Sequence, residues 1–341
     1  QTFRDLSKTL NLSNTDFIRT TEDRHKKTVQ YLWSELEKNG DIYLSKYSGW
    51  YSVSDEAFYN EDEIVEKNGV KIATASGSPI EWIEEESYFF RLSKWQDKLL
   101  DYYEKNSHFI SPTSRKNEVV SFVKSGLKDL SISRKAFSWG IKVPNNPKHV
   151  IYVWLDALTN YISALNYPST NDKLFKKFWP ASVHLIGKDI LRFHAVYWPA
   201  FLMAAKIPLP EKVYGHGWIL SGEEKMSKSK GNILDPLDII KTYGLDPLRY
   251  YLIKEVSFGN DGNISKDRLE DCINSDLANN YGNLCQRVTA FAEKNCSSKI
   301  PEIRKFNDDD LIILNRFTDN LTTIRKEIDN QNINYYINFI V

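Results

Sequence analysis

Cysteine is scarce in this chain of 341 residues, which contains three: Cys272, Cys285 and Cys296. None of them belongs to a CxxC pair, and no histidine lies near them at the spacing of a metal site. This scarcity argues against a disulfide framework and against a zinc site. Reduced thiols are typical of the cytoplasm, which we predict as the location, with an organelle matrix as the other compartment.

The chain also lacks a charge excess and a long apolar run. Lys+Arg and Asp+Glu both number 45, so a nucleic-acid site would have to be a local basic patch. The longest apolar stretch, residues 194–205, is too short to span a bilayer and contains Pro199. We therefore predict no membrane partner. The first residues contain neither an initiator Met nor an apolar signal, and the last carry no helix cap, so we expect a fragment of a longer protein.

Several common nucleotide and hydrolase motifs are missing. A Walker A loop requires Lys after its last Gly, but Gly217 and Gly222 are followed by Glu223. A dinucleotide fingerprint fails because Leu220 stands where the third Gly should follow Gly215 and Gly217. HExxH and GxSxG are absent as well. These absences exclude the most familiar phosphate-loop and zinc-protease assignments.

The first part of the chain alternates helical and strand patterns. Residues 25–39 have the apolar period of a helix, and Gly40 is suited to end it. Residues 41–59 mix aromatic residues with turn residues and predict strands. A helix is predicted next, with Ser93 and Gln96 as a capping box.

Three later segments each begin as a short apolar strand, at residues 149–152, 183–187 and 211–220. The first two lead into helices and the third into a lysine-rich loop. This alternation predicts an α/β fold with a doubly wound, parallel, Rossmann-like sheet, whose ligands bind where strands end. From about residue 266 the pattern is helical and mostly polar.

The lysine-rich loop reads KMSKSKGN from residue 225 to residue 232. Crowded ammonium groups suit either a solvated loop or a strongly anionic ligand, such as a triphosphate whose charge shifts during reaction. The loop resembles the second signature of class I aminoacyl-tRNA synthetases at all five signature positions: Lys225, Met226, Ser227, Lys228 and Ser229. This resemblance implies that ATP binds there during amino-acid adenylation, and assigns these five residues to catalysis.

The segments at residues 152–161, 185–200 and 243–263 resemble methionyl-tRNA synthetases. The resemblance implies a methionine–tRNA ligase, which forms methionyl-adenylate from methionine and ATP with Mg²⁺ and transfers the methionyl group to initiator and elongator methionine tRNA. A ligase for leucine, isoleucine or valine is a weaker alternative, because the insertion ahead of Trp154 is short. A non-catalytic tRNA-binding descendant of a synthetase is the other alternative.

Helical spacing predicts that two sets of side chains share one face each, the first around Trp154 and the second around His194. Taken alone, such stripes are typical of ordinary core, but an aromatic wall also suits a polarizable thioether. The resemblance places the methionine pocket at these positions: Trp154, Ala157, Leu158, Tyr161, Ile190, His194 and Trp198. Leu158 stands where relatives often have Pro.

The resemblance also implies contacts with the adenylate. Gly187 and Asp189 fall at a strand end, where the carboxylate is suited to an ammonium group or to a ribose hydroxyl. The residues implied to bind ATP are Gly187, Asp189, His216, Gly217, Ile219 and Lys228. Arg134 matches an arginine that orders the site, and its alternative is a surface arginine that closes a helix.

Two departures from the family pattern change the expectations. Ser52 and Asp55 stand where many relatives have a cysteine pair of a zinc knuckle, so we predict no zinc. The knuckle would then depend on aromatic packing of Trp50, Tyr51, Phe58 and Tyr59. No H-x-G-H element, the first class I signature, is present, so this chain alone is expected to be a poor catalyst.

In the helical part, Asn283 and Arg287 lie four residues apart and match anticodon-reading positions of the family. A solvated helix face is the alternative for this pair. The predicted regions are the end of the first Rossmann half (1–25), a connective insertion (26–143), the second Rossmann half with the lysine loop (144–235), a stem-contact region (236–265) and a helical anticodon-binding domain (266–341).

Overall fold

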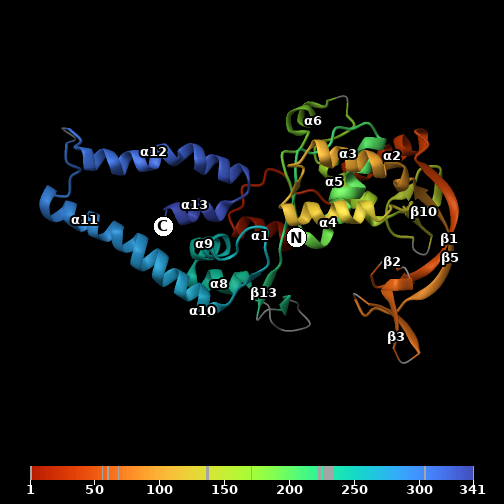
Figure 1. Ribbon diagram of the computed structural model, residues 1–341, viewed down its shortest axis with the longest axis horizontal. Helices are drawn as coiled ribbons and strands as arrows, with labels where there is room; N and C mark the ends of the chain where they lie inside the picture. The colour runs from red at the N-terminus through yellow and green to blue at the C-terminus, as the bar shows by residue number, and fades with distance from the viewer. Residues whose placement is uncertain are drawn as a thin grey trace. The chain divides into compact units, whose positions relative to one another are not determined.

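The computed structural model describes residues 2–55, 57–59, 61–67, 69–74, 76–135, 138–169, 171–221, 224–225, 234–302 and 305–340. They belong to two compact units, Gln1–Tyr214 and Gly215–Val341, and each unit is described by itself (Figure 1). Within the described ranges, no helix is both long and apolar enough to cross a membrane.

The first unit contains seven α-helices among its described residues: α1 (Thr2–Thr9), α2 (Asp23–Lys38), α3 (Gln96–Lys105), α4 (Thr113–Lys124), α5 (Val153–Ser163), α6 (Lys173–Phe178) and α7 (Trp198–Ala204). Helix α2 confirms the predicted period, because Val29, Leu32 and Leu36 are fully buried on one face. The backbone then turns at Gly40, whose φ of 73° is a left-handed conformation that glycine adopts without strain.

The start of α3 differs from the predicted capping box. A 3₁₀ turn (Leu92–Trp95) precedes the helix, whose N-cap makes no side-chain hydrogen bond. The Ser93 hydroxyl donates instead to Asp129 Oδ1 at 2.6 Å, and Gln96 Oε1 accepts from the Leu127 backbone N–H at 2.7 Å. Both side chains are therefore used to hold the following loop against the helix rather than to cap it.

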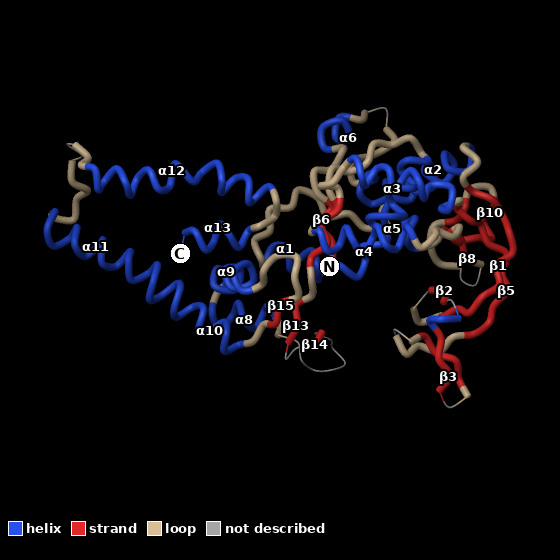
Figure 2. Tube along the Cα trace, viewed as in Figure 1, coloured by secondary structure: helices blue, strands red, loops and turns tan. Residues whose placement is uncertain are grey.

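A long antiparallel ribbon leaves this helical region (Figure 2). Strand β1 (Ile42–Ser52) pairs with β5 (Glu81–Phe90) along its length. The strands β2 (Ala57–Tyr59) and β7 (Leu130–Ser131) complete the sheet in the order β2-β1-β5-β7. A short 3₁₀ turn (Glu61–Glu63) and the hairpin of β3 (Ile64–Lys67) and β4 (Val70–Ala73) lie between β2 and β5 in the sequence.

A second sheet contains the parallel pairing that the alternation predicted. Its order is β11 (His184–Gly187), β12 (Val213–His216) and β6 (Ile110–Ser111), and β12 pairs parallel with β6. The mixed α/β character of the chain is thus as predicted. The segment after β11 passes through a 3₁₀ turn (Lys188–Ile190) and a π-helical turn (Phe193–Tyr197) into α7.

The strand predicted at residues 149–152 does not join that parallel sheet. It forms the end of β10 (Asn146–Ile151), which pairs antiparallel with β8 (Ser133–Arg134) and β9 (Lys142–Val143). The turn between β9 and β10 contains Asn145 with a φ of 63°, so the chain reverses within two residues and pairs locally. Local hairpin formation therefore overrides the strand–helix pattern here.

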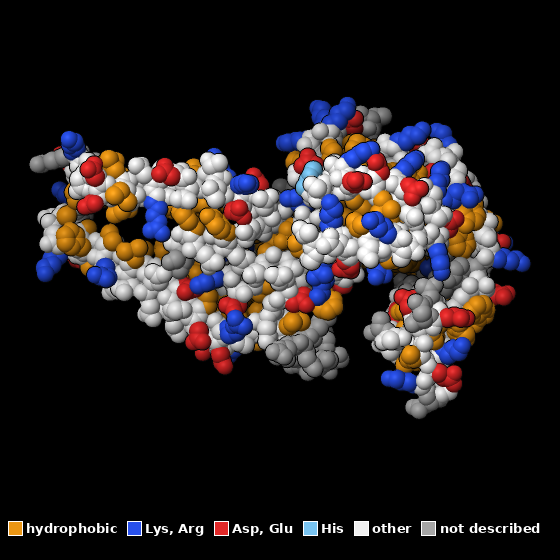
Figure 3. Space-filling view, viewed as in Figure 1, with side chains coloured by type: hydrophobic (Ala, Val, Ile, Leu, Met, Phe, Trp, Pro, Cys, Tyr) orange, Lys and Arg blue, Asp and Glu red, His pale blue; other side chains and the backbone are white. Residues whose placement is uncertain are grey.

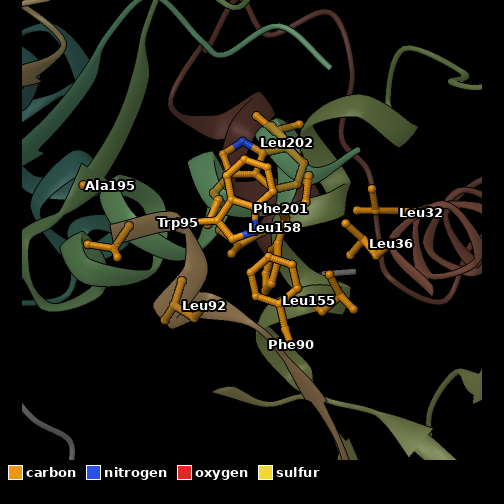
Figure 4. Close-up of a cluster of buried hydrophobic side chains, with 14 of the residues drawn as sticks. Leu32, Leu36, Phe90, Leu92, Trp95, Leu155, Leu158, Ala195, Phe201 and Leu202 are labelled. Carbon is orange, nitrogen blue, oxygen red and sulfur yellow. The ribbon is translucent and has the colours of Figure 1, made fainter. Parts of the chain in front are cut away.

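The core of the first unit lies between α2, α5, α7 and the base of the ribbon. Figure 4 shows Leu32 and Leu36 of α2 facing Leu155 and Leu158 of α5, with Phe90 and Phe201 beside them. The Phe90 and Phe201 rings meet edge to face, with centroids 4.8 Å apart. Helix α5 is therefore held on its apolar side by two other helices.

The second unit begins with a small sheet in the order β14 (Glu224–Lys225), β13 (Ile219–Ser221) and β15 (Gly262–Asn263). The predicted strand at residues 211–220 is therefore two strands, β12 and β13, in different sheets. Helices follow: α8 (Pro236–Tyr243), α9 (Leu245–Glu255), α10 (Lys266–Cys272), a π-helix (Ile273–Gly282), α11 (Asn283–Cys296), α12 (Asp308–Asp329) and α13 (Ile333–Ile340).

Two side-chain devices define helix ends in this unit. Asn307 and Asp310 form a reciprocal capping box at the start of α12. Asn334 of α13 donates to the carbonyls of Ile253, Lys254 and Val256, which end α9. Hydrophobic side chains remain exposed along α11 and α12, where Figure 3 shows them in orange between the two helices.

Candidate functional site

An aromatic and histidine cluster forms where α5 meets the segment that follows β11. The Trp154 ring of α5 stacks on Phe193, with centroids 3.6 Å apart and an interplanar angle of 8°. Trp154 also meets the His194 ring edge to face at 6.4 Å. Trp154 and Phe193 are half-buried, so this stack forms the accessible side of the cluster.

His194 connects the two elements through both ring nitrogens. Its Nδ1 lies 2.9 Å from the Ile190 carbonyl oxygen, which can only accept, so Nδ1 carries the proton. Its Nε2 lies 2.8 Å from the Tyr161 hydroxyl and accepts from it. Burial lowers the pKa of His194, although the bond to Ile190 opposes that change. The ring is therefore neutral at neutral pH.

His184 and Trp198 form the buried side of the cluster. The Trp198 indole Nε1–H donates to His184 Nε2 at 3.2 Å. The Tyr161 ring stacks on His184 with centroids 3.8 Å apart, and burial raises the pKa of Tyr161 to about 12. The cluster thus offers an aromatic wall with no ionised group among these rings, which suits an uncharged, polarizable ligand group.

The structure brings most of the predicted methionine-pocket residues together. Tyr161 and Ile190 both contact His194, which meets the Trp154 ring. Ala157, Tyr161 and Ile190 are half-buried, while His194 and Trp198 are buried. Leu158 is 1% exposed and packs into the hydrophobic core (Figure 4). Sequence reasoning missed His184 and Phe193. The available signal for His184 was that a polar histidine stands inside a short apolar strand, where burial alone does not require it.

The predicted second helix of this pocket is not one regular α-helix. Ile190 ends a 3₁₀ turn, His194 lies in the π-helical turn Phe193–Tyr197, and Trp198 begins α7. A π-turn adds one residue to the helical turn, and such turns are frequent at functional sites. Within this segment the His194 ring contacts the carbonyl of Ile190, four residues earlier. The three predicted residues therefore lie on three successive elements rather than on one α-helix, and their role in a methionine pocket stays a prediction.

A separate pocket of about 360 Å³ lies next to the start of α5. It is lined by Tyr51, Arg134, Trp139, Gly140, Val150, Ile151, Tyr152, Val153 and Asp156. Arg134 is 4% exposed in β8, donates to the Ser131 hydroxyl at 2.8 Å, and lies 4.6 Å from the Tyr152 ring centroid. The alternative of a surface arginine that closes a helix is therefore wrong.

Asp156 supplies a carboxylate to the same pocket. Its Oδ1 lies 2.6 Å from Nε2 of His25, a fully buried histidine of α2 whose Nδ1 lies 2.8 Å from the Ser163 hydroxyl. The order Asp–His–Ser has the contacts of a hydrolytic triad, but Ser163 is fully buried and no substrate carbonyl could approach it. The network instead ties α2 to the first and last turns of α5.

Gly187 and Asp189 lie at the end of β11, as predicted. Asp189 is exposed, and a Cβ atom at Gly187 would lie 2.6 Å from Asp189 Oδ1. A side chain at position 187 would therefore require this carboxylate to move away from the strand end. Its binding to an ammonium group or to a ribose hydroxyl stays a prediction.

The remaining predicted nucleotide residues belong to the second unit. The His216 ring stacks on Phe258, with centroids 6.1 Å apart, and Ile219 is 40% exposed. At Gly217 a Cβ would lie 2.2 Å from the backbone of Asn260, so the two chain segments touch through their main chains. Of the five signature residues, Lys225 ends β14, while Met226, Ser227, Lys228 and Ser229 lie outside the described residues.

Asn283 and Arg287 lie on the first turns of α11 and are both exposed. Their positions, one helical turn apart, leave both side chains accessible to a ligand. Their role in anticodon reading stays a prediction.

The predicted knuckle at the far end of the ribbon is centred on a carboxylate. Asp55 accepts hydrogen bonds from the hydroxyls of Tyr59 at 2.7 Å, Ser76 at 2.5 Å and Ser78 at 2.7 Å. Burial raises the pKa of Asp55, but these hydroxyls outweigh it and hold the pKa below its usual value. Of the aromatic residues predicted to hold the knuckle, Trp50 meets the Trp82 ring edge to face, with centroids 5.3 Å apart. The side chain of Phe58 lies outside the described part of the chain. Among the described residues, no group of three His, Cys, Asp or Glu is placed to bind a metal ion.

Comparison with known proteins identifies the class to which this fold and these residues belong. The family model described as tRNA synthetases class I (M) matches residues 1–289. This match covers more than half of the chain, which therefore belongs to the family of class I (M) tRNA synthetases.

The individual relatives share one printed name. Methionine–tRNA ligase of Brucella melitensis is 56% identical over 330 residues, which is 96% of this chain and 64% of the relative. Methionine–tRNA ligase of Rickettsia prowazekii is 59% identical over 304 residues, 89% of this chain and 59% of the relative. Methionyl-tRNA synthetase of Mycobacterium tuberculosis, solved with methionyl-adenylate, superposes with a TM-score of 0.94 at 47% identity and covers 99% of this chain and 66% of that one. The chain thus spans less than two thirds of these relatives' length.

Proposed function

We propose that this chain is part of a methionine–tRNA ligase, which activates methionine with ATP and transfers it to methionine tRNA. The observation that carries the proposal is the likeness over 99% of the chain to a synthetase solved with methionyl-adenylate. The neutral aromatic cluster around His194 adds a chemical reason, because thioether sulfur makes favourable contacts with aromatic rings.

In this proposal each group of residues has a separate task. Trp154, Ala157, Tyr161, Ile190, His194 and Trp198 surround the methionine side chain, and Leu158 supports them from the core. Gly187, Asp189, His216, Gly217 and Ile219 bind the nucleotide, and Arg134 orders the site. Lys225, Met226, Ser227, Lys228 and Ser229 close on the triphosphate, where ammonium groups stabilise the charge that develops as pyrophosphate leaves. ATP enters as its magnesium complex.

The fold belongs to this proposal as well. We assign the parallel sheet to a doubly wound, Rossmann-like core, the ribbon to the connective insertion, and residues 266–341 to a helical anticodon-binding domain in which Asn283 and Arg287 contact initiator and elongator methionine tRNA. The insertion is assigned no zinc, because hydroxyl groups occupy the Asp55 carboxylate where cysteine ligands would stand. We place the activity in the cytoplasm or in an organelle matrix.

Methionine-dependent ATP–pyrophosphate exchange tests the proposal. The 341-residue chain would be measured beside a version extended to the length of its relatives, with leucine, isoleucine and valine as competing amino acids. Exchange that requires methionine is the expected result. Exchange with another aliphatic amino acid would replace the proposed substrate, and tRNA binding without any exchange in either version would favour a non-catalytic descendant.

A further inference from the structure

His184 is buried behind the predicted methionine pocket and contacts two of its residues. It begins β11, is 2% exposed, and stacks on the Tyr161 ring at 3.8 Å with an interplanar angle of 20°. Its Nε2 accepts the indole N–H of Trp198 at 3.2 Å. One side chain of the sheet therefore contacts a ring from α5 and a ring from α7.

The hydrogen bonds determine where the proton of His184 lies. An indole nitrogen can only donate, so His184 Nε2 must be the unprotonated nitrogen and Nδ1 carries the hydrogen. His194 has the same tautomer, because its Nδ1 faces the Ile190 carbonyl. Adding a second proton to His184 would direct an N–H toward the Trp198 N–H. Both histidines are therefore held neutral, with their Nε2 atoms as acceptors for a pocket ring.

We propose that His184 is a positioning residue for methionine recognition: its acceptor nitrogen fixes the Trp198 indole and its ring face fixes Tyr161. The proposal rests on the proposed function, since it assigns His184 to the same pocket. His184 acts through those two rings and does not itself contact the substrate.

The surroundings of His184 support a role that needs a neutral ring. Burial, together with the neighbouring His194 ring 6.5 Å away, lowers the pKa of His184 to about 3. A charged group behind the pocket would have to be desolvated and would disfavour an apolar ligand. A phenylalanine there would preserve the stack but would leave the buried Trp198 N–H without an acceptor, which is unfavourable in the interior.

Two complementary variants separate the two contacts. His184→Phe keeps a ring against Tyr161 and removes the acceptor, whereas His184→Gln keeps an acceptor near Trp198 and removes the ring. The matched control is His149→Phe, because His149 is also fully buried and also bonds a neighbour, the Ser133 hydroxyl at 2.9 Å, outside the cluster. Each variant would be made in the version that is extended to the length of its relatives. Its pyrophosphate exchange would be measured with the methionine and ATP concentrations varied separately.

We expect His184→Phe to raise the KM for methionine about tenfold and to leave the KM for ATP within about twofold, since only the methionine pocket loses its support. His184→Gln should give an intermediate value. His149→Phe should leave both constants near those of the unchanged protein while costing comparable thermal stability.

An unchanged methionine KM in His184→Phe would overturn the inference. Equal rises in the KM for methionine and the KM for ATP would also overturn it, because they would mean that the substitution disturbs the whole site and not the methionine pocket alone. The proposed function fails in a distinguishable way, through a lack of methionine-dependent exchange in the protein without any substitution. All residues of the cluster belong to this 341-residue chain, so ¹⁵N spectra of the chain give a check that does not depend on activity. His184 must show the Nδ1–H tautomer, and any other tautomer contradicts the assignment.

Discussion

The two neutral histidines of the aromatic cluster link a local hydrogen-bond pattern to the pH behaviour of the molecule. In the unfolded chain His184 titrates near its ordinary value, about 6.5. In the folded protein burial lowers its pKa to about 3, and the pKa of His194 is also lowered. Between these values the unfolded state binds more protons than the folded state. Acidification in this range therefore favours unfolding.

The first unit should accordingly lose stability as the pH falls from about 6.5 to about 4.5, by roughly 2 kcal/mol from His184 alone. Urea unfolding followed by tryptophan fluorescence across that range measures this slope, because the tryptophans that pack around His184 report on this unit. His184→Phe should flatten the slope, whereas His108→Phe, which removes an exposed histidine, should not. A slope that is the same in all three proteins would contradict the buried neutral assignment.

The positions of single residues were predictable where a local helical spacing relates them, and were missed where their partners are distant in sequence. The i, i+3, i+4, i+7 spacing predicted four residues on one face of α5. Trp154, Ala157 and Tyr161 are half-buried, whereas Leu158 packs into the hydrophobic core. His184 was missed because a strand-start histidine has no period to reveal it, and its partners come from two elements distant in sequence. The capping box at Ser93 was wrong because Asp129, 36 residues later, is a better partner for that hydroxyl.

At the scale of elements, the sequence pattern predicted helices well and helix type poorly. The α2 period and its end at Gly40 follow from local apolar spacing and from backbone conformation, both of which act within a few residues. The π-turn at Phe193–Tyr197 and the π-helix at Ile273–Gly282 do not, because the apolar period that predicts a helix does not distinguish a π-helical turn from an α-helical one. Strand partners were similarly unpredictable, as β10 shows by its antiparallel pairing.

The π-helix gives a prediction whose sign distinguishes it from an α-helix. In an α-helix, Gly→Ala stabilises by about 0.5–1 kcal/mol because it reduces the freedom of the unfolded chain. At Gly282 an added Cβ would lie 2.7 Å from the Leu277 carbonyl oxygen, so Gly282→Ala should destabilise the second unit by about 1–3 kcal/mol. Urea unfolding followed by circular dichroism measures this difference.

The matched control for Gly282→Ala lies one element later. Ala292→Gly in α11 is a substitution in a regular α-helix and should cost about 0.5–1 kcal/mol through helix propensity alone. Stabilisation by Gly282→Ala of the size that an α-helix shows would mean that Ile273–Gly282 is α-helical in solution.

At the scale of the whole molecule, family membership was predictable from the sequence, because the signature and three neighbouring segments are long and specific. The structure adds that the residues predicted for methionine and the lysine signature belong to different compact units. The residues proposed for the methionine side chain all lie in Gln1–Tyr214, whereas the lysine signature belongs to Gly215–Val341. Composition alone could not have shown this division, since the charge is balanced over the chain.

This division predicts separable kinetic effects. Lys228→Ala removes a cation proposed to stabilise the leaving pyrophosphate, so it should lower kcat for pyrophosphate exchange about a hundredfold and leave the KM for methionine within about twofold. Lys230→Ala is the matched control, because it removes the same charge from the same loop at a position outside the five-residue signature. It should retain nearly full activity. Equal losses in the two variants would mean that the loop acts only through its total charge, and a shared rise in methionine KM would mean that the two sets of residues do not act separately.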